Sequence, residues 1–274
     1  MNPTPSSPLP FYQPLQLGEG QHRWALLTPA LRPYISSCWE VSIPAGIFDY
    51  TAIPDTCQHL VSITAPNCSL GHLCLPAIFP LKRQIIGPAK LFGITFMPGM
   101  RQRFIPIEIK QHERIQSWAD LSSRPLSHLE IALNSEPEFQ QKVHLVELWV
   151  TQQLQCQTIT DSHKQKPFLS AFQSIKDALG NNALNEQWAR ERGVSSRHLR
   201  RLFLHNLDMT PKQYADIVRF QSSIQIIAHQ GIDVLYQSHR YYDESHLIRQ
   251  FKKFTGLTPR GFKNLSVLSK SDAG

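Results

Sequence analysis

The chain has 274 residues, of which 41% are hydrophobic, and this is enough apolar material for two domains with separate cores. No stretch approaches the roughly eighteen consecutive apolar residues of a membrane span, which argues against a membrane protein. The net charge of +7 is localised: residues 1–164 carry 12 Lys/Arg and 12 Asp/Glu, which leaves 28 − 12 = 16 and 21 − 12 = 9 in residues 165–274. Such a basic end indicates a module that binds a polyanion.

The first 15 residues are rich in proline and have neither the basic region nor the apolar run of an export signal. They predict a disordered lead-in. The chain has 5 cysteines, an odd number, and without an export signal these fit reduced thiols in a cytoplasm.

Residues 16–156 are predicted to form one domain. Up to about residue 106, short apolar runs such as 38–43, 59–65 and 89–97 are separated by Pro and Gly, which is typical of a β-sandwich or small β-barrel. Helical patterning follows at 126–133 and 137–156, with a proline in the first turn of the second helix.

The helix at 137–156 carries a wide apolar stripe that allows two interpretations. Its members Phe139, Val143, Val146 and Val150 are four, three and four positions apart, and Leu145, Trp149 and Leu154 widen the stripe. The stripe either packs onto the barrel or forms the seam of a homodimer, because a stripe of this width can serve two surfaces.

The polar stretch 157–166 is predicted to be a linker, and 167–266 an all-helical domain, so that the whole chain belongs to the α+β class. Helices are expected at 168–179 and 184–192, after which Gly193 provides a tight turn and Ser195 an N-cap. A long helix at 211–229 connects this unit to a second one that begins at 232. Helix, short turn and basic helix are the components of a helix-turn-helix.

An internal repeat identifies two such units. The segment SSRHLRRLF (195–203) returns as ESHLIRQFKKF (244–254), and each copy has an apolar face and a basic face when drawn as a helix. Each is followed by Thr-Pro, at Thr210-Pro211 and Thr258-Pro259. A repeated basic helix predicts two DNA-recognition units on one chain.

Residues 168–264 resemble the DNA-binding domain of the AraC/XylS family of bacterial transcription regulators. The resemblance is carried by Ala189, Gly193, Val194, Ser195, Arg197, Leu199, Arg201, Phe203, Thr210, Pro211, Tyr214, Arg219, Ile232, Asp243, Ser245, His246, Arg249, Phe251, Lys252, Lys253, Thr255, Gly256, Thr258 and Pro259. It implies two helix-turn-helix units that contact adjacent major-groove segments. By matching positions, the DNA contacts fall to Arg197, Arg200, Arg201, Glu244, Ser245, His246 and Arg249. Of these, Arg197 and Arg201 are expected to contact bases, whereas Arg249 suits a base or a phosphate equally.

Three positions depart from the family pattern. Tyr236 stands where the family has Ala, while Arg240 and Asp208 stand where it has Gly. An arginine in a left-handed turn would cost about 1–3 kcal/mol, whereas aspartate tolerates that conformation. The second unit is therefore expected to be tilted, partly unseated or mainly a phosphate clamp.

The N-terminal region resembles the degenerate cupin-like sensory domain of one AraC subgroup. The matching segments are Ile53-Pro54-Asp55, His59-Leu60-Val61 and Phe96-Met97-Pro98-Gly99-Met100. The resemblance implies a small-molecule effector inside the barrel. The metal-binding histidines of cupins are not recognisable, so no cofactor is expected. A separate set could bind zinc or copper or sense thiols, although its spacing matches no standard motif and Cys is often a core residue: Cys57, His59, Cys68, His72 and Cys74.

No catalytic motif stands out, so an enzyme is not expected. The preferred hypothesis is a cytoplasmic, nucleoid-associated transcription regulator, an effector-responsive activator by resemblance, with double-stranded promoter DNA, RNA polymerase and a second copy of itself as partners. The alternatives are a ligand-independent regulator that a partner protein controls through the N-terminal domain, and an enzyme whose basic tail anchors it to nucleic acid. An apolar cavity, an exposed apolar patch or a perturbed acid–base pair, respectively, would discriminate them.

Overall fold

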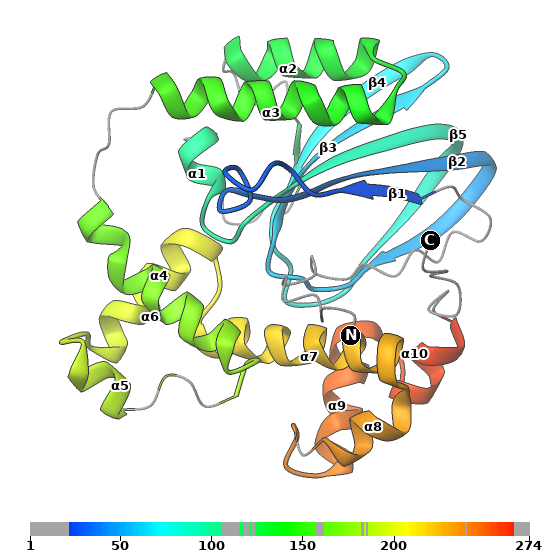
Figure 1. Cartoon of the computed structure of the whole chain (residues 1–274). Coiled ribbons are helices and arrows are strands. Elements are labelled where there is room, and N and C mark those ends of the chain that lie inside the picture. The colour runs from blue at the N-terminus through cyan, green and yellow to red at the C-terminus, as the bar shows by residue number, and fades with distance from the viewer. Residues whose placement is uncertain are drawn as a thin grey trace, which may run out of the picture.

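In the computed structural model the described residues are 22–105, 115–117, 121, 124–156, 162–181, 184, 186–238 and 240–265. A β-rich N-terminal half is followed by helices, which confirms the α+β class (Figure 1). The strands are β1 (His22–Ala25), β2 (Ile35–Ala52), β3 (Gln58–Ala65), β4 (Cys68–Cys74), β5 (Leu81–Phe96) and β6 (Ile115–Ser117). They form one antiparallel sheet in the order β1-β2-β5-β3-β4-β6.

The helices fall into two groups. Those of the N-terminal half are α1 (Arg101–Phe104), α2 (Arg124–Ser135) and α3 (Phe139–Cys156). Those of the C-terminal half are α4 (Ser162–Asp177), α5 (Glu186–Glu191), α6 (Ser196–Leu207), α7 (Pro211–Gln230), α8 (Ile232–Gln237), α9 (Glu244–Thr255) and α10 (Pro259–Leu265). Figure 1 shows α2 and α3 on one face of the sheet, with α7 on its other side. Among these helices, none is long and apolar enough to cross a lipid bilayer.

Helix α3 packs onto the sheet through the stripe that the sequence identifies. Val146 and Val150 are fully buried, in one core with sheet residues such as Phe92 and Ile94. Lys142 lies in the same interface, where its Nζ is 2.8 Å from Glu40 Oε2. The interpretation that this stripe packs onto the sheet of its own chain is therefore confirmed, while a dimer seam on the helix stays a prediction.

The predicted lead-in lies outside the described residues, as do 157–161 of the predicted linker; residues 162–166 form the start of α4. The N-terminal sheet rests directly on the C-terminal helices. Ile53 belongs to the C-terminal core, and Gln221 Nε2 of α7 donates to the Pro54 carbonyl oxygen at 2.7 Å. At the end of α6, Gln102 Nε2 donates to the carbonyl oxygen of His205 at 3.0 Å. These contacts attach the loop after β2 and helix α1 to the C-terminal helices.

Candidate nucleic-acid interface

Helix α6 begins and ends where the sequence predicts, and it exposes a basic face. Ser195 Oγ accepts a hydrogen bond from His198 N at 3.2 Å, which caps the first turn. Gly193 supplies the turn before it with a φ of 60°, and Asp208 ends it with a φ of 54°. The left-handed conformation expected at Asp208 is thus confirmed. The inner face is buried through Leu199, Phe203 and Leu207, and the outer face exposes Arg197, Arg200 and Arg201.

Helix α9 repeats this frame with a different cap. Asp243 Oδ1 accepts from His246 N at 2.6 Å, and Gly256 ends the helix with a φ of 79°. The buried face consists of Leu247, Phe251 and Phe254. The exposed face consists of Glu244, Ser245, Arg249, Lys252 and Lys253.

The two units correspond residue by residue. Their N-caps, Ser195 and Asp243, are 243 − 195 = 48 positions apart, and the same offset relates the buried Phe203 to the buried Phe251. Applied to the outer face, it places Arg201 with Arg249, but Arg197 with a serine. The buried frames are therefore equivalent, whereas the first unit exposes more arginines than the second.

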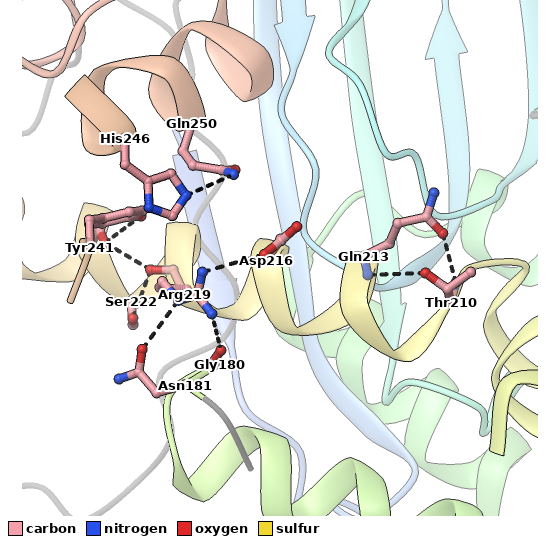
Figure 2. A network of polar contacts seen from close by, with 11 residues as sticks. Gly180, Asn181, Thr210, Gln213, Asp216, Arg219, Ser222, Tyr241, His246 and Gln250 are labelled. Atoms are coloured by element: carbon pink, nitrogen blue, oxygen red, sulfur yellow. Dashed lines mark hydrogen bonds and ion pairs between the residues drawn. The ribbon is translucent and has the colours of Figure 1, made fainter. Parts of the chain in front are cut away.

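One predicted contact residue is partly withdrawn from the surface. His246 is only partly exposed, and its ring lies edge-on against Tyr241, with 5.4 Å between ring centroids. Its Nε2 is 3.5 Å from Gln250 Nε2 (Figure 2). This contact fixes the orientation of the imidazole at the start of α9.

Helix α7 joins the two units and belongs to the core of both. It begins with a capping box, in which Thr210 Oγ1 accepts from Gln213 N and Gln213 Oε1 accepts from Thr210 N (Figure 2). Near its start, Tyr214 packs against Phe203 of α6; in its middle, Phe220 packs against Phe251 of α9. One rigid helix thus fixes the separation of α6 and α9.

The second unit is not partly unseated, whereas a tilt and a role as a phosphate clamp stay predictions. Its apolar residues Leu235, Leu247, Phe251 and Phe254 are all buried in the same core as the first unit. Tyr236 is accommodated at the edge of that core, where the guanidinium of Arg260 lies 5.9 Å from its ring centroid. The guanidinium of Arg240 turns back to α7, where Nη1 donates to Ser222 Oγ at 2.9 Å.

Two features of the turn between α8 and α9 were not predicted from the sequence. Tyr242, directly before the N-cap of α9, is 94% exposed, an unusual fraction for an aromatic side chain. The contact between Arg240 and Ser222 was also missed, because its partners are 18 positions apart and belong to different elements. The amphipathic pattern of α7 gives no sign that Ser222 has a partner.

The Cys/His candidates of the N-terminal half do not come together as a metal site. Among the residues that the structure describes, no group of three His, Cys, Asp or Glu could hold a metal ion. His59 Nε2 is 2.8 Å from Asp55 Oδ2, while the fully buried Cys57 has its thiol pKa raised well above the usual value by desolvation. Cys68 and Cys74 lie at opposite ends of β4, and burial lowers the pKa of His72 between them.

Comparison with known proteins identifies the C-terminal module. Residues 188–264 match a protein family described as "Helix-turn-helix domain", while no curated protein matches the chain. Among solved structures, ToxT from Vibrio cholerae matches over 90% of this chain and 99% of its own, with 10% identity and a TM-score of 0.46. ToxT bound to (E)-4-(8-methylnaphthalen-1-yl)but-3-enoic acid matches over 90% and 98%, with 12% identity and a TM-score of 0.45. Fatty-acid-bound ToxT matches over 90% and 96%, with 9% identity and a TM-score of 0.43.

The class that these observations define is a DNA-binding domain. Residues 188–264 form a helix-turn-helix domain of the AraC type, as the sequence predicted. The matched segment includes both recognition helices and α7 between them.

Proposed function

We propose that the chain is a sequence-specific transcription regulator that binds double-stranded promoter DNA through α6 and α9 together. The observation that carries this proposal is the repeat: two equally capped helices with basic outer faces are packed on one rigid helix. Helix α7 has 20 residues and holds α6 near its start, at Tyr214, and α9 in its middle, at Phe220. Two basic helices that are held on one helix in this way can enter adjacent major-groove segments of a duplex.

The test uses the full chain and a binding site selected from random duplexes. Binding should weaken steeply as salt rises, because contacts to phosphates release counterions. Replacing Arg197 and Arg249 together by alanine should weaken binding to the selected site and relax the preference for its sequence. Replacing Arg23 and Arg83, which are exposed on the N-terminal sheet, removes the same charge and should leave the preference intact. Equal losses in both double variants would contradict a DNA interface on α6 and α9.

The proposal extends to an effector-responsive activator, with the N-terminal sheet as the sensory part. Side chains alternate between the two faces of the sheet along each strand. Phe92 and Ile94 lie on the face that α3 covers. Leu91, Val41 and Ile43 form a separate apolar cluster on the opposite face. This second apolar face is where an effector would bind. Native mass spectrometry of the protein from its own host should detect a retained small molecule, and the bare mass of the chain would argue against it.

A second candidate is a regulator that a partner protein controls. Ile47 and Ile86 face each other across β2 and β5, yet they are 69% and 72% exposed. Such a pair favours a protein contact. If this candidate holds, Ile47→Ser should abolish regulation of a promoter reporter in cells and leave DNA binding by the pure protein unchanged. The same experiment distinguishes activation from repression. The proposal includes three further properties. The protein forms a homodimer, contacts RNA polymerase and is located in the cytoplasm, in association with the nucleoid.

A further inference from the structure

Two side chains of the second unit's turn are attached to the middle of α7. Arg240 Nη1 donates to Ser222 Oγ at 2.9 Å, and the Tyr241 hydroxyl is 3.0 Å from Ser223 Oγ. Both contacts are partly buried. Two hydrogen bonds from adjacent residues of the turn to adjacent residues of the helix resist rotation of one element against the other.

The same part of α7 is attached to the first unit through Arg219. Its Nη2 donates to the Gly180 carbonyl oxygen and its Nε donates to Asn181 Oδ1 at 3.2 Å, both in the turn after α4 (Figure 2). Gly180 lies so close to α7 that a β-carbon there would come within 2.2 Å of the Ala215 carbonyl oxygen. The carbonyl oxygen of Arg219 in turn accepts from the hydroxyls of Ser222 and Ser223, at 2.9 and 2.8 Å.

The attachment continues to the recognition helix. The Tyr241 ring lies edge-on against the His246 imidazole near the start of α9 (Figure 2). Burial raises the pKa of the Tyr241 phenol to about 12, so its hydroxyl stays protonated and can donate at physiological pH. A continuous path of contacts therefore runs from the turn after α4, through Arg219 and the two serines, to the first turn of α9.

We infer that Arg240 and Tyr241 are positioning residues that set the orientation of α9 on α7, and hence the spacing of the two DNA segments that the protein recognises. The inference rests on the proposed function. Arg240 acts through Ser222 and not by contact with DNA, because its guanidinium is directed back to α7 and partly buried there. A chain in which this contact is broken keeps both recognition helices but no longer holds them in one relative orientation.

The test measures binding of the full chain to duplexes in which the two recognised segments are at the selected separation, or one or two base pairs nearer or farther. The wild type should bind best at one separation. Ser222→Ala and Arg240→Ala should weaken binding there by about 3- to 10-fold, the factor that corresponds to one lost hydrogen bond. They should also flatten the dependence on separation. Ser222→Thr, which keeps the hydroxyl, should restore it.

Arg249→Ala is the matched control, since it removes an arginine from the exposed face of α9 without touching α7. It should weaken binding equally at every separation. The inference is overturned if Ser222→Ala has the wild-type dependence on separation, or if Arg240→Ala behaves as Arg249→Ala does while Ser222→Ala has no effect. A wild-type chain that binds no duplex in a salt-dependent manner would instead contradict the proposed function.

Discussion

Helices α6 and α9 bury equivalent side chains and expose different ones. Both have a capped first turn and a left-handed residue at the C-terminal end. Outside, α6 exposes three arginines, whereas α9 exposes one arginine, two lysines and Glu244. Burial restricts the inner positions to apolar residues of suitable volume, while the outer positions are free to vary. The frame is therefore shared, and specificity is expected to be unequal.

The largest expected effect concerns the two equivalent phenylalanines at the centre of the buried faces. Phe203 and Phe251 are both fully buried, and each packs against aromatic rings of α7, at Tyr214 and Phe220 respectively. Replacing either by alanine should lower the free energy of unfolding by about 3–5 kcal/mol, because a large cavity is left. Urea denaturation of the full chain measures this loss. If Phe251→Ala costs much less than Phe203→Ala, the second unit is packed more loosely than its burial indicates.

The difference between the outer faces predicts unequal discrimination among DNA sequences. Arg197→Ala and Arg201→Ala should each reduce the free energy of DNA binding by about 1–3 kcal/mol. Each should also relax the base preference at one position, as loss of a bidentate guanine contact does. Arg249→Ala, at the position equivalent to Arg201, should weaken all sequences evenly, as loss of a phosphate contact does. Binding to a panel of single-base variants measures both effects, and equal losses of discrimination would remove the asymmetry.

The sequence predicts the helix ends and the buried faces of the two units much better than the hydrogen bonds between distant elements. The cap at Ser195 and the buried Phe203 and Phe251 follow local rules of spacing and hydrogen bonding. The orientation of the Arg240 guanidinium does not follow such rules, because it depends on a hydrogen bond to Ser222, which is 18 positions away in the chain. The valines of α3 show a related point: an apolar stripe indicates that a surface is covered but not what covers it, and here the chain's own sheet does so.

A smaller effect is expected at the two glycines with left-handed backbone conformations, one before α6 and one after α9. Gly193 and Gly256 have φ values of 60° and 79°, and a β-carbon at either would meet no atom of the described part of the chain within 4 Å. Alanine at each should therefore cost about 1 kcal/mol through backbone strain alone. Gly256→Asn should cost less, because asparagine tolerates the left-handed conformation, as Asp208 does at the equivalent position of the first unit. Thermal unfolding measures these differences, and a larger loss with Gly256→Asn than with Gly256→Ala would point to side-chain contacts in place of strain.

The smallest expected effect concerns a hydroxyl that distinguishes the two cores. Tyr214 and Phe262 are equivalent by the repeat and both buried, but the Tyr214 hydroxyl has no hydrogen-bond partner among the residues that the structure describes, and burial raises its pKa well above the usual value. An unpartnered polar group in a core is a cost, so Tyr214→Phe should leave the free energy of unfolding unchanged or raise it by up to about 1 kcal/mol. Tyr241→Phe is the matched control: its hydroxyl pairs with Ser223, and its loss should cost about 1 kcal/mol. Urea denaturation of both variants provides the comparison. If Tyr214→Phe proves the more costly of the two, the hydroxyl has a partner in solution, and the first unit's core is held by a polar contact that the second unit lacks.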